Sequence, residues 1–300
     1  MRVLITGGAG YIGSRLARRL GCSGIRDVMA LDNLRRGRRA AVAGDTRFVE
    51  GDVRDEQLLL ELTRGVDLVY HLAAESAVMS AAADPEYCFS TNVTGTFRVL
   101  RAAQANGVKR VVFSSSREVY GEGVTLPVSE DAPLEPRNIY GASKAAGEKC
   151  CGAFMSGMEI SIVRLANVYG PGDQGRVIPK FVHAALRDQP LTLFGATQVM
   201  DFVWVDTVVD ALVRLGTGPH LAGPFNIGCG RGTTIVDLAQ RVVAAAGSRS
   251  TVEIAARREV EVMRFVADTR AAERDLGLGI PDDPLFGLPA VIDAARIEMK

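Results

Sequence analysis

The chain has 300 residues, of which 47% are hydrophobic, and this length fits one large α/β domain or a core domain with a smaller one attached. Its 35 basic and 35 acidic side chains balance, which excludes the basic field expected of a protein that binds nucleic acid or an anionic membrane. The apolar stretches are strand-length and the sequence opens on a strand pattern, so we expect a cytoplasmic protein without membrane or nucleic-acid partners.

The first predicted strand, Val3–Ile5, leads directly into the glycine-rich segment Thr6–Gly13. Three glycines of this segment have the G-x-G-x-x-G spacing, and a helical pattern follows over Ser14–Leu20. Such a turn lets the backbone bend tightly and brings a helix N-terminus up to a pyrophosphate. A glycine-rich loop without a ligand is the alternative, but the strand before it and the helix after it favour a dinucleotide-binding turn.

The second predicted strand, Val28–Leu31, ends at Asp32, which follows Gly13 by nineteen positions. A carboxylate at this point can accept hydrogen bonds from both ribose hydroxyls but repels a 2′-phosphate, so the sequence favours NAD over NADP. The basic segment Arg35–Arg39 could pair with a phosphate instead. We favour a solvated basic loop for this segment, because the charge of Asp32 would first have to be overcome.

Strand and helix patterns alternate through the first half of the chain, which indicates a doubly wound parallel α/β sheet of the Rossmann type. Ligands of such sheets lie beyond the carboxyl ends of the strands, so we expect the chemistry there. The predicted strands are Val3–Ile5, Val28–Leu31, Arg47–Val49, Leu68–His71, Val111–Phe113 and Ile160–Arg164, separated by helical stretches such as Tyr87–Ala105 and Tyr140–Phe154.

Beyond about residue 167 the pattern becomes irregular: Gly170-Pro171-Gly172 interrupts it, and short helices and strands follow in mixed order. We therefore predict an NAD-binding Rossmann domain over residues 1–166 and a smaller, mixed substrate-binding lobe over residues 167–300. Within residues 201–227 of the second part, Phe202–Leu215 and Phe225–Ile227 are candidates for a return to the first domain.

Tyr140 and Lys144 are four residues apart, so in a helix both side chains project from one face. A nearby ammonium and a positive nicotinamide ring would lower the tyrosine pKa from about 10 towards neutral pH, which turns the phenol into a usable general base. The serines Ser114–Ser116 follow the strand Val111–Phe113, and a hydroxyl at that sheet edge can hydrogen-bond a reacting oxygen. A surface helix and an ordinary serine turn are the alternatives.

Cysteine and histidine are sparse and scattered along the chain. The five cysteines and three histidines show neither the spacing of a metal site nor that of a disulfide framework. We therefore predict reduced thiols and no metal centre.

Several motifs, taken jointly and in order, resemble those of the extended short-chain dehydrogenase/reductases, in particular the NAD-dependent nucleotide-sugar epimerases and dehydratases. The motifs cover nearly the whole chain and are Thr6–Gly13, Leu31-Asp32-Asn33, Gly51-Asp52-Val53, His71-Leu72-Ala73-Ala74, Asn92–Thr96, Ser114–Gly121, Tyr140–Lys144, Arg164–Gly172 and Val266-Ala267-Asp268. The resemblance implies a nucleotide-sugar substrate, bound NAD, and a homodimer formed through the helical stretches Tyr87–Ala105 and Tyr140–Phe154.

The resemblance also implies roles for individual residues. Ser116 and Tyr140 would share the proton of the sugar 4-hydroxyl, with Lys144 beside Tyr140, and Glu118 is similar to the catalytic base of dehydratases and decarboxylases. The implied cofactor-binding residues, with Asp52 and Val53 by the adenine, are Gly7, Gly10, Tyr11, Ile12, Gly13, Asp32, Asn33, Asp52, Val53, Leu72, Ala73, Ala74, Asn92, Ser114, Tyr140 and Lys144. The implied substrate-binding residues are Ser116, Arg117, Asn167, Val177 and Arg258.

The chain departs from the family pattern at one residue and at one motif. Met200 stands where family members usually carry an arginine on the substrate diphosphate, which puts that contact in doubt. Ser116-Arg117-Glu118 differs from the small residues usual in 4-epimerases, from the Thr-Asp-Glu of 4,6-dehydratases and from the Thr-Ser-Glu of decarboxylases. Phe265 aligns with a position that borders the sugar C2 substituent in the family, where its ring would leave little room for an N-acetyl group.

Three functions are open at this point. The leading hypothesis is a 4-epimerase that removes hydride from C4 with bound NAD and returns it to the other face of a transient 4-keto sugar. In the second, Glu118 removes the C5 proton, which leads to dehydration or, with a uronate, decarboxylation. The third is a non-catalytic dinucleotide-binding protein, against which the intact Ser116, Tyr140 and Lys144 argue. In an epimerase we expect Glu118 to be a structural neighbour paired with Arg117.

Overall fold

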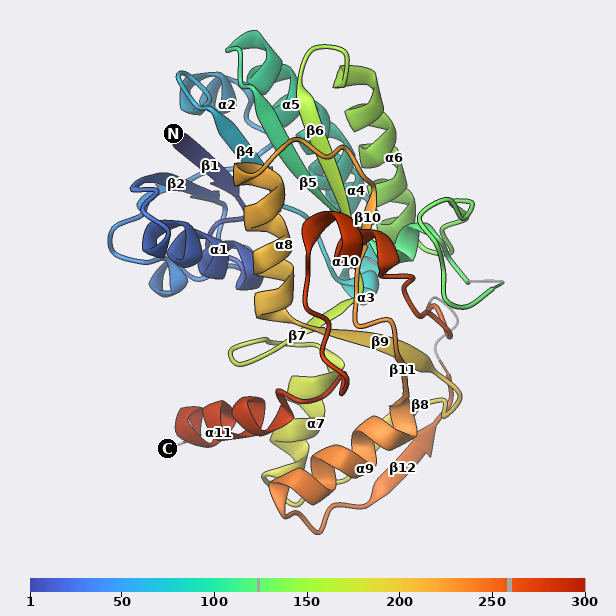
Figure 1. Ribbon diagram of the computed structural model, residues 1–300. Helices are drawn as coiled ribbons and strands as arrows, with labels where there is room; N and C mark the ends of the chain where they lie inside the picture. Colours follow the sequence, from blue (N-terminus) through green and yellow to red (C-terminus); the bar gives the residue numbers. More distant parts are fainter. Residues whose placement is uncertain (123–124, 258–260, 300) are drawn as a thin grey trace.

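A seven-stranded parallel sheet forms the centre of the protein, in the order β10-β6-β5-β4-β1-β2-β3 (Figure 1). The computed structural model describes residues 1–122, 125–257 and 261–299. The sheet confirms the predicted doubly wound α/β fold. Its strands are β1 (Arg2–Thr6), β2 (Asp27–Asp32), β3 (Arg47–Glu50), β4 (Leu68–His71), β5 (Arg110–Ser116), β6 (Glu159–Leu165) and β10 (Phe225–Ile227).

Helices cover both faces of this sheet. On one face lie α1 (Tyr11–Cys22) and α8 (Val205–Thr217), and on the other lie α2 (Glu56–Leu62), α5 (Thr96–Ala105) and α6 (Ile139–Phe154). In β1, Val3 and Ile5 belong to the first core and Leu4 to the second, because successive side chains of a strand point to opposite faces. Burial on both faces explains why the central strands are continuously apolar.

The smaller lobe packs around its own apolar core at the lower end of the molecule in Figure 1. It contains a three-stranded sheet β11-β9-β7 and a two-stranded sheet β12-β8. Its elements are β7 (Asn167–Tyr169), α7 (Val177–Ala185), β8 (Leu191–Phe194), β9 (Val199–Trp204), β11 (Gly232–Thr234), α9 (Ile235–Ala246), β12 (Val252–Ala255) and α11 (Leu288–Glu298). Between β9 and β11 the chain crosses back, since α8 packs against α1 and β10 pairs with β6.

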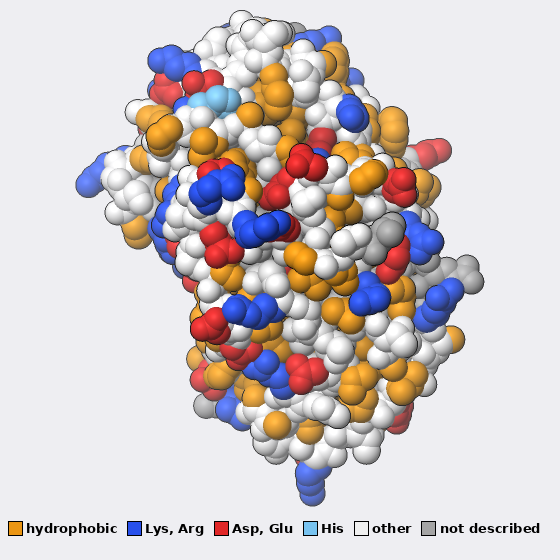
Figure 2. All heavy atoms as spheres, turned by 45° about the vertical axis from the view of Figure 1, so that its right-hand side comes forward, with side chains coloured by type: hydrophobic (Ala, Val, Ile, Leu, Met, Phe, Trp, Pro, Cys, Tyr) orange, Lys and Arg blue, Asp and Glu red, His pale blue; other side chains and the backbone are white. Residues whose placement is uncertain are grey.

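Short helical segments complete the fold: η1 (Arg39–Ala41), α3 (Val78–Ala83), α4 (Pro85–Phe89), η2 (Ser90–Gly95), η3 (Arg117–Val119) and α10 (Arg270–Leu276). Among the described residues, no helix is both long enough and apolar enough to span a bilayer. Figure 2 shows acidic and basic side chains intermixed over the face that it presents, in keeping with the balanced composition.

Two predicted element boundaries differ from the structure. The stretch Tyr87–Ala105 is not one α-helix, because the π-helical turn η2 separates α4 from α5. At the end of this turn, Thr96 Oγ1 donates to the Asn92 carbonyl at 2.6 Å. The Asn92 carbonyl thereby has a hydrogen-bond partner in the widened turn. The serines Ser114–Ser116 do not follow β5 but form its last three residues, since β6 extends far enough to pair with them.

Candidate active site

A cavity of about 1430 Å³ lies between the carboxyl ends of the central strands and the smaller lobe. It brings together most of the predicted site residues, whose roles remain predictions: Gly7, Gly10, Tyr11, Ile12, Gly13, Asp32, Asn33, Val53, Leu72, Ala73, Ala74, Ser114, Ser116, Arg117, Glu118, Tyr140, Lys144, Asn167 and Val177 line it. Asp52 and Asn92 are not part of the lining. Arg258 lies outside the described residues.

The glycine-rich turn after β1 has the geometry that its spacing predicts. Gly7 has a φ of +73°, which favours glycine, and a Cβ at Gly13 would lie 2.2 Å from the Gly7 carbonyl oxygen. Helix α1 starts at Tyr11, immediately after the turn, and its first residues line the cavity. The positive end of this helix therefore faces the cavity, where it can bind a pyrophosphate.

Asp32 is the last residue of β2 and lines the cavity. Its Oδ2 accepts a hydrogen bond from the Ala9 amide at 3.0 Å, and its Oδ1 accepts one from the Leu34 amide at 2.9 Å. Burial raises the pKa of Asp32, and these amide hydrogen bonds act in the opposite direction. The carboxylate is thus held in place at the point where a ribose hydroxyl of a dinucleotide can reach it.

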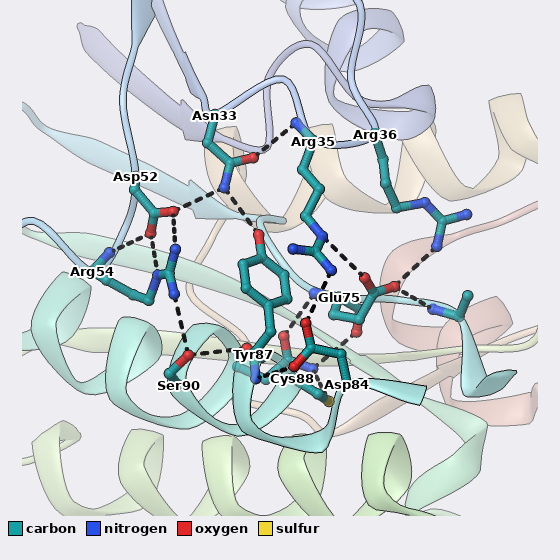
Figure 3. A network of polar contacts seen from close by, with 12 residues as sticks. Asn33, Arg35, Arg36, Asp52, Arg54, Glu75, Asp84, Tyr87, Cys88 and Ser90 are labelled. Carbon is teal, nitrogen blue, oxygen red and sulfur yellow. Dashed lines mark hydrogen bonds and ion pairs between the residues drawn. The ribbon is translucent and has the colours of Figure 1, made fainter. Parts of the chain in front are cut away.

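Asp52 is not part of the cavity lining, and its place by the adenine stays a prediction. Its carboxylate accepts hydrogen bonds from Arg54 Nε at 2.9 Å and from Asn33 Nδ2 at 2.9 Å (Figure 3). The Arg54 hydrogen bond is the main reason that the pKa of Asp52 is lowered to about 2. Val53, next in the chain, does line the cavity.

Asn92 lies outside the cavity lining as well, and its role as a cofactor ligand stays a prediction. Its Oδ1 accepts a hydrogen bond from the Glu75 amide at 2.8 Å, and its Nδ2 donates to Ser143 Oγ at 2.9 Å. With 1% exposure it lies behind the wall. It joins the loop after β4 to α6, which carries the tyrosine and the lysine.

Helix α6 places Tyr140 and Lys144 on one face, and both side chains line the cavity. The Asn138 side chain caps the helix, accepting a hydrogen bond from the Gly141 amide at 2.8 Å. The first turn packs closely against η3, since a Cβ at Gly141 would lie 2.3 Å from the Glu118 carbonyl oxygen. This packing sets the position of Tyr140 beside Ser116.

The Tyr140 pKa lies above its usual value in this structure, and its expected lowering beside Lys144 and a nicotinamide ring stays a prediction. Burial raises this pKa to about 12, and a hydrogen bond with the Ser116 side chain acts in the opposite direction. Lys144 is equally buried, and burial lowers its pKa to about 8. Its Nζ donates to the Ser114 carbonyl at 2.7 Å. Desolvation is thus the largest influence on the pKa of both groups.

Glu118 is held at both carboxylate oxygens. Arg117 NH2 lies 2.8 Å from its Oε1, and Asn138 Nδ2 donates to its Oε2 at 2.7 Å. Both members of the ion pair are buried. The expected pairing with Arg117 is confirmed, and Asn138 is a second partner that the sequence analysis did not identify.

On the side of the smaller lobe, Asn167 and Met200 both line the cavity. Asn167 Nδ2 donates to the Asp201 carbonyl at 3.0 Å, which ties β7 to β9. Phe265 does not line the cavity: its side chain is 1% exposed and its ring stacks on Tyr120 at 5.9 Å between centroids. The expected limit on the sugar C2 substituent stays a prediction.

Two residues of the loop between β7 and α7 line the cavity and were missed by the sequence analysis. Asp173 is 7% exposed, burial raises its pKa to about 6, and its Oδ2 has no hydrogen-bond partner within the described part of the chain. Arg176 lies 3.2 Å from the other oxygen of Asp173, and its charge acts to lower the pKa of Tyr140. Both lie in a glycine-rich stretch whose sequence indicates only a break in the pattern.

Comparisons with known proteins agree with this geometry. Residues 3–228 match the model of the NAD dependent epimerase/dehydratase family. UDP-glucose 4-epimerase of Mycolicibacterium smegmatis is 36% identical over 293 residues, which cover 92% of this chain and 93% of that protein. The structure of UDP-glucose 4-epimerase from Thermotoga maritima with UDP-glucose superposes with a TM-score of 0.95 at 30% identity and full coverage of both chains. The structure of dTDP-glucose 4,6-dehydratase from Streptomyces venezuelae with NAD has a TM-score of 0.94 at 34% identity, covering 99% of this chain and 97% of that one.

Proposed function

This chain belongs to the NAD-dependent epimerase/dehydratase family, and we propose that it is a nucleotide-sugar 4-epimerase that works through a transient 4-keto sugar. The observation that carries the choice within the family is Glu118, whose two carboxylate oxygens are engaged by Arg117 and Asn138. A carboxylate held in this way is a poor candidate for abstracting a proton from carbon.

The cavity residues fit NAD. The turn at Gly7–Gly13 places the start of α1 where it can bind a pyrophosphate, and the Asp32 carboxylate can accept hydrogen bonds from ribose hydroxyls. When bound, NAD supplies the nicotinamide carbon that accepts and returns a hydride, together with a positive charge near the tyrosine.

Three side chains of this protein would handle the proton of the sugar 4-hydroxyl. The Tyr140 oxygen would take the proton as a phenolate, Ser116 would share it through the hydrogen bond between the two side chains, and Lys144 would supply positive charge on the same helix face. The smaller lobe, whose elements lie within residues 167–300, would hold the nucleotide, with Asn167 and Val177 on the cavity wall.

The second candidate function is a dehydratase or decarboxylase. It is supported by the position of Glu118 on the cavity wall and by the similarity to a 4,6-dehydratase structure. The two functions differ in product mass, because epimerisation conserves mass whereas loss of water or carbon dioxide does not.

The Glu118→Gln variant tests this choice. For an epimerase we expect it to retain a substantial part of the wild-type rate, because a glutamine can keep one acceptor for Asn138 while the ion pair with Arg117 is lost. If Glu118 were the C5 base, the same substitution would lower turnover on the order of 10²-fold or more. The measurement is turnover of a panel of nucleotide sugars, followed by mass spectrometry.

Wild-type enzyme in D₂O gives an independent readout of the same choice. We expect products of unchanged mass and no deuterium at C5. Deuterium at C5 would contradict the epimerase proposal and support the dehydratase or decarboxylase.

Replacement of Asp32 by alanine should weaken NAD binding by about tenfold or more, since a charge-assisted hydrogen-bond acceptor for the ribose is lost. Discrimination against NADP should relax as well, because the repulsion of a 2′-phosphate disappears. Binding titrations with both nucleotides measure this. Asp27→Ala, at the other end of β2 and paired with Arg2, is the matched control and should leave both affinities unchanged. A wild-type preference for NADP would contradict this role of Asp32.

A homodimer and a cytoplasmic location are further parts of this proposal. Large apolar side chains are exposed along α4, α5 and the end of α6: Phe89 is 57%, Phe97 41% and Met155 38% exposed. Association of two copies through these helices would bury them, as the family resemblance implies.

A further inference from the structure

A buried carboxylate, Glu75, engages two arginines at the edge of the dinucleotide-binding part of the cavity (Figure 3). It is 3% exposed and follows β4. Arg36 NH1 donates to its Oε1 at 3.1 Å, and Arg35 Nε lies 3.9 Å from its Oε2. The Ala77 amide also donates to Oε1, at 3.2 Å, which holds the carboxylate in its place.

The two arginines belong to the loop that begins at Asp32, the residue expected to select NAD. β1 lies between β2 and β4 in the sheet, so the contacts with Glu75 span the end of β1 and its glycine-rich turn. The loop folds closely onto Asp32, since a Cβ at Gly37 would lie 2.8 Å from Asp32 Oδ1. Arg36 therefore directly precedes Gly37, the glycine that packs against the Asp32 carboxylate.

The two guanidinium groups differ in how many partners hold them: Arg35 has further partners besides Glu75. Arg35 stacks on the Tyr87 ring, with its Cζ 3.6 Å from the ring centroid, and also pairs with Asp84 at 3.3 Å. Arg36 is partly exposed, and Glu75 is the ion-pair partner that the structure describes for it. Of the two, Arg36 is the guanidinium that loss of Glu75 would release.

We propose that Glu75 determines dinucleotide selectivity by withholding Arg36 from a 2′-phosphate. Asp32 repels a 2′-phosphate, while Glu75 and Asp84 hold the Arg36 and Arg35 guanidinium groups that could offset this repulsion. This inference rests on the proposed NAD dependence. It also explains why a loop rich in arginine, which the sequence alone could assign to a phosphate, accompanies an NAD-selecting aspartate.

The test is the Glu75→Gln variant, which keeps the size of the side chain and an acceptor oxygen for the Ala77 amide. NAD and NADP compete for the protein, and the bound nucleotides are then extracted and quantified by chromatography. We expect the ratio of bound NADP to NAD to rise by about tenfold or more, as charge-assisted hydrogen bonds to a phosphate allow. The gain should shrink at high ionic strength, because the freed guanidinium is exposed to solvent.

Two further variants make the test specific. Adding Arg36→Ala to Glu75→Gln should remove the gain. Asp282→Asn, which removes an equal charge from an exposed pair with Arg231 in the smaller lobe, should leave the ratio at its wild-type value.

An unchanged ratio in Glu75→Gln that still binds NAD would overturn the proposal. So would a loss of NADP binding in Arg36→Ala alone, because it would mean that Arg36 already serves a phosphate in the wild type, and this variant is informative even if Glu75→Gln does not fold. Absence of any epimerised product would refute the proposed function instead, since the nucleotide ratio is measured without turnover.

Discussion

Tyr140→Phe is expected to lose about 10²–10⁴-fold in turnover, the usual contribution of general acid–base catalysis. The variant removes the hydroxyl that would take the proton of the sugar 4-hydroxyl, while the ring keeps its packing against Cys88 and Ala81 in the wall. Because burial raises the Tyr140 pKa to about 12 despite the hydrogen bond with Ser116, formation of the phenolate base depends on positive charge brought to it. Steady-state turnover of a nucleotide sugar measures the loss.

Tyr70→Phe is the matched control for this variant. The Tyr70 hydroxyl is buried beneath α8, lies outside the cavity lining, and has no hydrogen-bond partner among the residues that the structure describes. Its removal should leave turnover unchanged. Full turnover by Tyr140→Phe, with thermal unfolding of both variants like that of the wild type, would refute the proposed proton transfer.

Lys144→Met is expected to lose most of the activity, because it deletes the positive charge of the catalytic helix face and keeps a side chain of similar length. The pKa of Lys144 is lowered to about 8 by burial, so the ammonium loses its proton as pH rises through that value. Wild-type turnover should therefore decline above about pH 8, and the residual turnover of the variant should lack this decline. A pH–rate profile of both proteins measures it.

Lys149→Met is the control on the same helix, since Lys149 is exposed and does not line the cavity. It should keep both the wild-type rate and the wild-type pH profile. A Lys144→Met enzyme with wild-type turnover and the same alkaline decline would show that another group titrates there.

Local sequence rules account for the parts of the fold and site that could be predicted. A φ of +73° at Gly7 and the close approach of Gly13 to the Gly7 carbonyl are backbone requirements that glycine meets, and they are encoded within one turn. The apolar strands and the four-residue spacing of Tyr140 and Lys144 are likewise read from neighbouring positions. The order of these motifs along the chain is what the family resemblance contributed to the prediction.

Contacts between distant residues account for what could not be predicted. Asn92 and Asp52 match family motifs, yet their side chains hydrogen-bond with Ser143 and Asn33 and lie outside the cavity lining. Phe265 matches by its distance along the chain but is covered by Tyr120. A motif specifies a residue type at a position, whereas the direction of its side chain depends on neighbours supplied by other elements.

The sequence by itself determined the doubly wound sheet, the dinucleotide-binding turn and the Y-x-x-x-K pair, because periodicity and backbone conformation are properties of short segments. The tertiary structure alone decided the charge states and partners in the site: the raised pKa of Tyr140, the capture of Glu118 by Asn138, and the placement of Glu75 against Arg36. These depend on burial and on electrostatic interactions across elements far apart in the chain, since desolvation and Coulomb energy follow distance in space, not separation in sequence.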